Sequence, residues 1–205
     1  MKIIIIGAGT AASNVADIII QDRNFEIAGF VGTKDEDKKL EGKKIYANIP
    51  FLGDRGILPK LKDNEIFGFV AAIGNNIIRE KAFYEATLAG LTPINAISKN
   101  AIIEPSAKIE GGVVISSGCI VAHGVTISNN TYLGSGVIVE INSNIGENCH
   151  FYPGSIVGGK CEIGRNVTMG VRSVIQPYIK IGKNQNINAG QVVAKDLPDL
   201  IRREK

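Results

Sequence analysis

The sequence predicts two structural parts: an α/β domain at the N-terminal end, followed by a parallel β-helix of six-residue repeats. The β-helix is indicated by a period, because every sixth residue from Ile97 to Val193 is apolar without a break. The α/β domain is indicated by two strands that each run into a glycine loop and a helix. A period of six does not match the 3.6-residue period of an α-helix, whereas it fits a stack of short strands. Three repeats would complete one coil, so residues eighteen apart are expected to stack at the strand spacing of ~4.8 Å.

Two further features of the repeat describe its interior and its corners. The residue four positions after each apolar anchor is small or slim and is expected to point inward. The three cysteines, Cys119, Cys149 and Cys161, all fall at this position, so we expect buried thiols that pack as small apolar groups and bind no metal. Glycine often follows the anchor directly, as in Gly146 and Gly164. We expect it there to allow unusual backbone angles at the corner.

The N-terminal region alternates apolar strands with helices. The expected elements are a strand at 2–6, a helix at 11–21, a strand at 26–31, a strand at 67–73 and a helix at 77–89. Strands that alternate with helices in this way predict a small, doubly wound parallel sheet.

The first strand leads into a G-x-G-x-x-A loop, which lets a phosphate approach the backbone at a helix N-terminus. A dinucleotide site would want an acidic residue at the end of the second strand, where this chain has Gly32, Thr33 and Lys34. A mononucleotide is therefore favoured over NAD, and a purely structural glycine turn is the alternative. The candidate substrate-binding residues are Gly7, Gly9, Thr10, Ala11, Asn75 and Asn76.

Composition argues against several other classes of protein. The net charge is +3 and the basic residues are scattered, which gives no sign of nucleic-acid binding. No apolar run reaches the ~18 residues of a membrane span. The N-terminal apolar run is too short for a signal peptide. The sequence thus predicts a cytoplasmic protein without membrane insertion.

Several motifs together resemble the NeuD/PglD family of bacterial sugar O- and N-acetyltransferases. They are IIIIGAG (3–9), AIGNNIIR (72–79), IGENCHFYPGSIVGG (145–159) and IGRNVTMG (163–170). The resemblance implies a Rossmann-like nucleotide-sugar-binding domain over 1–95. It also implies a left-handed β-helix (hexapeptide-repeat) acyltransferase domain over 96–205.

The resemblance also implies partners and site residues. It implies a homotrimer with active sites between adjacent β-helices, acetyl-CoA as acyl donor, and a nucleotide-linked amino sugar as acceptor, for surface-glycan synthesis. The family's donor-site histidine falls on His150, and the Gly159 amide would meet the thioester carbonyl. Gly170 and Val171 would line the CoA channel.

One position departs from the family pattern. The family has a catalytic histidine nine residues before the donor-site histidine, and this chain has Ile141 there. His123 precedes Ile141 by one coil, and it is either a base moved along the cleft or a solvated corner residue. The other candidates for proton removal are Glu140, His150 and the substrate itself.

Two functions follow as hypotheses. The first is CoA-dependent acyl transfer to the amino group of a nucleotide-linked amino sugar; an amine is favoured over a hydroxyl because it needs less help from a base. The second is a catalytically impaired nucleotide-sugar-binding or scaffold homologue, which Ile141 would explain. A dinucleotide-dependent protein is disfavoured. So is a metal site at His123 and His150, which lie on different sides of the predicted coil without a third ligand.

Overall fold

The computed structural model describes residues 1–61 and 65–201 and divides into two compact units, Met1–Lys99 and Asn100–Lys205. The helices are α1 (Thr10–Asp22), α2 (Lys34–Leu40), η1 (Arg55–Ile57), α3 (Leu58–Leu61) and α4 (Asn76–Leu88). None of the helices within the described residues has the length and apolarity needed to cross a membrane.

The first unit holds a six-stranded sheet with the order β3-β4-β2-β1-β5-β6. Its strands are β1 (Lys2–Ile6), β2 (Glu26–Gly32), β3 (Lys44–Tyr46), β4 (Ile49–Asp54), β5 (Ile66–Ala71) and β6 (Thr92–Pro93). Every neighbouring pair is parallel except β3 and β4. The three predicted strands and two predicted helices are confirmed to within two residues. The three strands correspond to β1, β2 and β5, which are neighbours in the sheet.

The central strand β1 is apolar from Ile3 to Ile6 because both of its faces are buried there. Ile4 and Ile6 belong to one core cluster together with residues of α3, α4 and β5. In that cluster the rings of Phe69 and Phe83 meet edge to face, with their centroids 5.4 Å apart. Alternation along the strand turns Ile3 and Ile5, which are fully buried, to the opposite face. This strand therefore fixes where the loop that follows it emerges.

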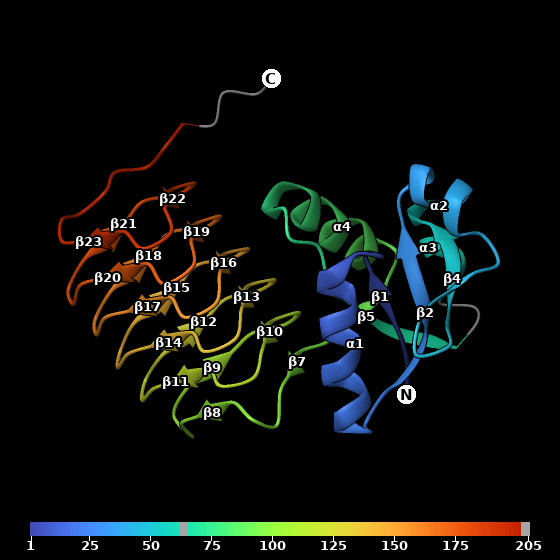
Figure 1. Cartoon of the computed structure of the whole chain (residues 1–205), viewed down its shortest axis with the longest axis horizontal. Helices are drawn as coiled ribbons and strands as arrows, with labels where there is room; N and C mark the ends of the chain where they lie inside the picture. The colour runs from blue at the N-terminus through green and yellow to red at the C-terminus, as the bar shows by residue number, and fades with distance from the viewer. Residues whose placement is uncertain (62–64, 202–205) are drawn as a thin grey trace. The chain divides into compact units, whose positions relative to one another are not determined.

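Two-residue strands run through the repeat region and stack into three parallel sheets (Figure 1). The first sheet has the order β22-β19-β16-β13-β10-β7, the second β23-β20-β17-β14-β11-β8 and the third β21-β18-β15-β12-β9. The strands are β7 (Ala96–Ile97), β8 (Ile102–Ile103), β9 (Lys108–Ile109), β10 (Val114–Ile115), β11 (Ile120–Val121), β12 (Thr126–Ile127), β13 (Tyr132–Leu133), β14 (Ile138–Val139), β15 (Asn144–Ile145), β16 (His150–Phe151), β17 (Ile156–Val157), β18 (Glu162–Ile163), β19 (Thr168–Met169), β20 (Val174–Ile175), β21 (Lys180–Ile181), β22 (Asn186–Ile187) and β23 (Val192–Val193).

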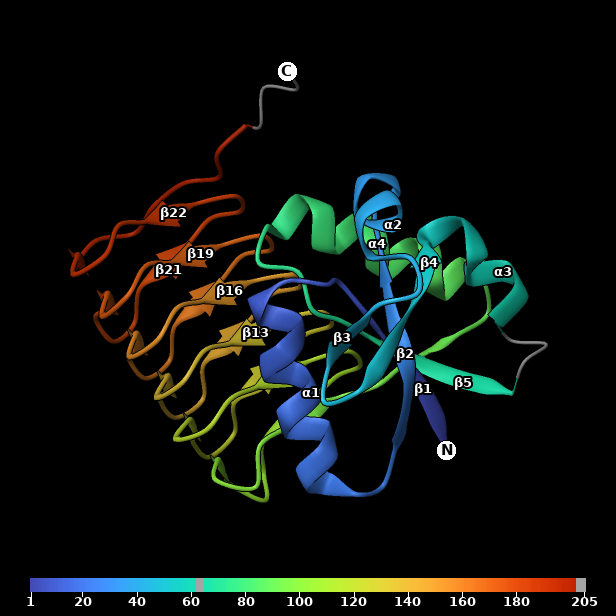
Figure 2. The ribbon, with the colours of Figure 1, turned by 45° about the vertical axis from the view of Figure 1, so that its right-hand side comes forward.

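The register confirms the predicted coil, since Ile120 pairs with Ile138 and Val121 with Val139. Figure 2 shows β13, β16, β19 and β22 one above the other along one side of this left-handed β-helix.

The interior follows the predicted inward positions. All anchors from Ile115 to Val193 are buried. The three cysteines are buried as predicted, and each thiol lies near a backbone carbonyl of the next coil, as Cys119 Sγ does at 3.1 Å from Gly134 O. Burial raises the pKa of the Cys119 and Cys161 thiols. They serve as packing groups in the coil.

The explanation expected for the glycines after the anchors is wrong. The left-handed backbone conformation lies two residues later, at every sixth residue from Gly112 to Gly190, where φ is between 54° and 74°. The glycines that follow the anchors serve close packing instead: a Cβ on Gly146 would lie 2.8 Å from Arg165 N, and one on Gly164 2.8 Å from Lys183 N. Coils stack too closely there for any side chain.

Asparagines at one corner form a ladder along the β-helix axis. Asn130, Asn148, Asn166 and Asn184 all adopt positive φ. Each Nδ2 donates to the next Oδ1, at 2.8, 2.5 and 3.2 Å in turn. The ladder ends where Asn184 Nδ2 donates to Leu200 O at 2.9 Å. The residues at 196–200 thus cover part of the last coil's edge, an edge that open β-structures need to protect.

Candidate functional site

A cavity of about 310 Å³ opens at the carboxyl ends of β1, β2 and β5. The glycine loop forms its floor. Gly7 has a φ of +124°, and a Cβ there would lie 2.5 Å from Ala72 O, so only glycine fits. Gly9 is the N-cap of α1 and offers no side-chain cap, and the first turn carries no acidic residue. Backbone N–H groups at this helix start therefore remain available to an anion.

Of the predicted substrate-binding residues, Gly7, Gly9, Thr10 and Ala11 line this cavity. The other two have structural partners. Asn75 Oδ1 caps α4 by accepting from Ile77 N and Ile78 N at 3.0 and 3.1 Å.

Asn76 is buried, and its Oδ1 accepts from an Nη of Arg79 at 3.2 Å. Neither asparagine is among the residues that line the cavity. Their role in binding stays a prediction.

The sequence reasoning missed three polar residues of the cavity wall: Thr33, Glu36 and Arg55. Thr33 N and Oγ1 donate to Glu36 Oε2 at 2.8 and 3.0 Å, and Glu36 N donates back to Thr33 Oγ1 at 3.3 Å. This reciprocal capping box starts α2. The T-x-x-E spacing of Thr33 and Glu36 in the sequence could have predicted this capping box. Arg55 follows β4, a strand that the sequence analysis did not predict.

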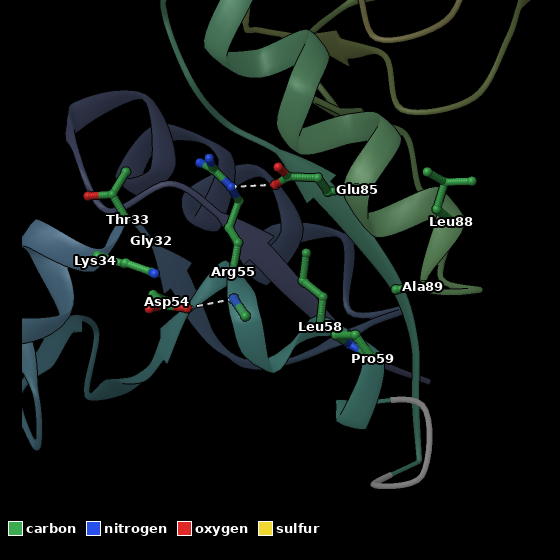
Figure 3. Close-up of a pocket in the computed structure, with 11 residues that line it drawn as sticks. Gly32, Thr33, Lys34, Asp54, Arg55, Leu58, Pro59, Glu85, Leu88 and Ala89 are labelled. Carbon is green, nitrogen blue, oxygen red and sulfur yellow. Dashed lines mark hydrogen bonds and ion pairs between the residues drawn. The ribbon is translucent and has the colours of Figure 1, made fainter.

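A second cavity, of about 760 Å³, shares Gly32, Thr33 and Arg55 with the first (Figure 3). Leu58, Pro59, Leu88 and Ala89 give it apolar walls. Arg55 Nε donates to Glu85 Oε2 at 2.6 Å across this space, as the dashed line in Figure 3 shows. Arg55 therefore lies where the two cavities meet.

One corner of the β-helix holds His123, Ile141 and Gly159 on consecutive coils. Asn142 N donates to His123 O at 2.9 Å, Lys160 N to Ile141 O at 2.8 Å, and Tyr178 N to Gly159 O at 2.9 Å. The predicted stacking of His123 under Ile141 is confirmed. His123 is therefore two coils from Gly159, or about 10 Å at the strand spacing.

The Gly159 amide has the features expected of an oxyanion donor. Among the described residues its N–H donates no hydrogen bond. A Cβ at Gly159 would lie 3.3 Å from Ile141 Cγ1, so the Ile141 side chain adjoins this amide. Ile141 itself is 45% exposed. The N–H thus has an apolar neighbour, and Gly159 itself is partly exposed.

Two of the candidates for proton removal, His123 and Glu140, are exposed. His123 Nδ1 lies 2.8 Å from Ser106 Oγ, which accepts from Gly124 N at 3.0 Å. Glu140 is exposed too, and its backbone N–H donates to Val157 O at 2.9 Å. The structure assigns neither side chain to a shared cluster with Gly159.

His150 lies in an aromatic stack on another side of the coil. It is buried, with Tyr152 stacked on it at 4.3 Å between centroids and Tyr132 tilted at 4.9 Å. The two tyrosines fix the plane of the imidazole. The period could have found Tyr132, because it stands one coil before His150.

The predicted CoA-channel residues differ in character. Gly170 is explained by packing, since a Cβ there would lie 2.5 Å from Ala189 N. Val171 is 45% exposed and available to a ligand. Within the described parts of the chain, no group of three or more His, Cys, Asp or Glu residues could hold a metal ion.

Comparison with protein families gives two matches. Residues 2–86 match the PglD N-terminal domain. Residues 142–177 match the bacterial transferase hexapeptide family of six repeats. No curated protein sequence matches significantly.

Solved structures extend the match to nearly the whole chain. PerB from Caulobacter crescentus, in complex with CoA and GDP-perosamine, is 27% identical with a TM-score of 0.89, over 98% of this chain and 92% of PerB. A variant of the GDP-perosamine N-acetyltransferase from the same organism, with the same ligands, is 26% identical with a TM-score of 0.74, over 97% and 91%. The acetyltransferase domain of PglB from Neisseria gonorrhoeae has the same fold, at 24% identity and a TM-score of 0.78, over 97% and 93%.

Proposed function

Because the chain belongs to the NeuD/PglD-like sugar acetyltransferases, we propose that it transfers an acetyl group from acetyl-CoA to the amino group of a nucleotide-linked amino sugar. One observation carries this proposal: the chain matches, over 98% of its length, an enzyme whose structure holds both CoA and GDP-perosamine. The 1–95 region would bind the nucleotide sugar, and the 96–205 region would carry the acyl transfer.

The glycine-loop cavity suits the nucleotide end of the acceptor. Gly7 and Gly9 keep the backbone bare, and the N-terminus of α1 presents free N–H groups without an acidic residue in its first turn. A phosphate there would meet donors and the positive end of the helix dipole.

The Gly159 amide suits the acyl end of the reaction. The neutral amine attacks the thioester carbonyl carbon, the carbonyl oxygen becomes an oxyanion, and the Gly159 N–H stabilises that charge. Collapse of the intermediate breaks the carbon–sulfur bond and releases CoA as the thiolate, which takes up the proton that the nitrogen loses. His150, held between Tyr132 and Tyr152, would position the donor, and the exposed Val171 would line its path.

Ile141 favours an amine as the nucleophile. The residue adjoins Gly159 and cannot accept a proton. An apolar neighbour disfavours the charged form of a nearby amine, so it raises the fraction of neutral, nucleophilic nitrogen. A hydroxyl group would gain nothing from this and would still need a base. N-acetylation is therefore favoured over O-acetylation.

A thiol-release assay tests the function. Acetyl-CoA is offered with UDP-, GDP- and dTDP-linked 4-amino sugars, and the matching 4-hydroxy sugars serve as controls. We expect CoA release with an amino sugar only. Tight binding of a nucleotide sugar without CoA release would instead favour the catalytically impaired homologue.

We further propose that the protein works as a cytoplasmic homotrimer. The β-helix exposes large apolar residues outside the proposed site, among them Ile102 and Val192, which a neighbouring copy would cover. Light scattering coupled to gel filtration measures the mass: three times the 21.9 kDa of one chain is expected, and a single-chain mass would contradict this assembly.

A further inference from the structure

The glycine-loop cavity contains one basic side chain, which no predicted role accounts for. Among the residues that line this cavity, Arg55 is the only cation and Glu36 the only anion. The Glu36 carboxylate already accepts two hydrogen bonds from Thr33. A ligand with two phosphates would bring further negative charge into the same space.

Arg55 has hydrogen-bonding capacity to spare. A guanidinium carries five N–H donors. Arg55 Nε donates to Glu85 at 2.6 Å, and within the described residues the two Nη groups donate to no protein atom. The Arg55 side chain as a whole is 19% exposed. Four N–H groups at a cavity wall without protein partners indicate a site that is completed by an acceptor from outside.

The surroundings hold the guanidinium in place. Asp54 Oδ1 accepts from Gly56 N at 2.6 Å, which closes the turn that carries Arg55. Glu85, on α4, takes the Nε edge from the side of the larger cavity (Figure 3). Because a guanidinium is planar, the fixed Nε also fixes the direction of both Nη groups. Glu85 thus serves as a positioning residue for Arg55.

We propose that Arg55 binds the diphosphate of the nucleotide-linked substrate, with its two Nη groups on the phosphate oxygens and Glu85 holding its orientation. This proposal rests on the proposed function and adds the residue that neutralises the diphosphate. Two parallel N–H donors match a pair of phosphate oxygens. The charge of Arg55 also offsets the repulsion between the diphosphate and Glu36.

Calorimetric titration of the full-length protein tests the proposal. The ligands are UDP, GDP and dTDP, followed by the nucleoside of whichever diphosphate binds the wild type most tightly. The variants are Arg55→Gln, Arg55→Lys and Glu85→Ala. Lys81→Gln is the matched control, because Lys81 Nζ is 3.9 Å from the same Glu85 but lines neither cavity.

We expect Arg55→Gln to weaken diphosphate binding about 10- to 100-fold, the loss of charge-assisted hydrogen bonds, while nucleoside binding changes less than about twofold. Arg55→Lys should recover part of the loss, Glu85→Ala should cost less than Arg55→Gln, and Lys81→Gln should leave the ratio of diphosphate to nucleoside affinity unchanged. Thermal unfolding of each variant identifies any that fails to fold. If Arg55→Gln does not fold, the affinities of Arg55→Lys are compared with those of the wild type instead.

Two results would overturn the proposal in different ways. If Arg55→Gln folds and weakens the binding of the diphosphate and of the nucleoside equally, or changes neither affinity, Arg55 forms a structural ion pair only. The proposed function then still stands. If the wild type binds no nucleoside diphosphate at all, the proposed function itself fails, and this assignment fails with it.

Discussion

Replacement of Gly159 by proline removes a single backbone N–H from the proposed thioester site. The structure indicates that this corner accepts proline. Pro105 and Pro177 occupy the same position of the same corner on other coils, and Pro153 occupies the same repeat position at another corner. The Gly159 N–H donates no hydrogen bond within the described residues, so the fold loses none. The carbonyl of residue 159 would still accept from Tyr178 N.

The expected magnitude is that of one oxyanion donor. Loss of such a donor lowers kcat by about 10²–10³-fold, or ~2.7–4 kcal/mol of transition-state stabilisation. Gly159→Ala is the matched control: it introduces the same Cβ, 3.3 Å from Ile141 Cγ1, but keeps the N–H. The ratio of the two variants' rates therefore removes the effect of the added Cβ.

Steady-state thiol release measures both variants, with acetyl-CoA binding by calorimetry and thermal unfolding as controls. We expect kcat of Gly159→Pro to lie about 100-fold or more below that of Gly159→Ala, with similar melting temperatures. A folded Gly159→Pro whose kcat is within about threefold of Gly159→Ala would refute the oxyanion role, because the reaction would then proceed equally well without the N–H.

Three further changes have expected outcomes. His123→Ala should alter kcat in the thiol-release assay less than about threefold, because His123 is ~10 Å from Gly159 and a base must reach its proton by hydrogen bond; a loss above 100-fold would instead assign the base to it. Asn148→Gly keeps the positive φ but breaks two ladder bonds, so urea denaturation should show a loss of about 2–4 kcal/mol, whereas Asn142→Gly, at an exposed corner, should be nearly neutral. The 3 cysteines should resist Ellman's reagent at pH 8 in the native protein, since burial raises the pKa of Cys119 and Cys161 and so lowers their thiolate fraction; rapid native labelling would contradict that burial.

The β-helix could be predicted from sequence because its interior selects residues by size and polarity at a fixed spacing. Each anchor, such as Ile127 or Phe151, fills the same kind of space on every coil, so one rule repeats many times. The backbone conformation of the corners was harder to predict. Asn, Lys, Arg and Tyr all occur at positive φ here, for example Asn148 and Tyr178. Only the structure shows which corner positions adopt positive φ and which glycines are needed for close packing.

The first unit was predicted only in part, for a different reason. Strands β1 and β5 are buried and apolar, so their pattern is clear. β3 and β4 lie at one edge of the sheet. β3 has no fully buried residue, and β4 mixes exposed with buried ones, which leaves no clean period. Arg55 lies directly after β4, so the cation of the glycine-loop cavity was missed together with the strand that places it.

The corner that holds Ile141 explains why the fold is predictable while its chemistry is not. Across the coils this corner carries Pro105, His123, Ile141, Gly159 and Pro177, four different residue types at one structural position. Side chains there contribute little to the interior, so packing places almost no demand on them. A histidine or an isoleucine at residue 141 would be compatible with the same coil. In the proposed function, an isoleucine beside the Gly159 N–H suits an acceptor that arrives as a neutral amine and loses its own proton.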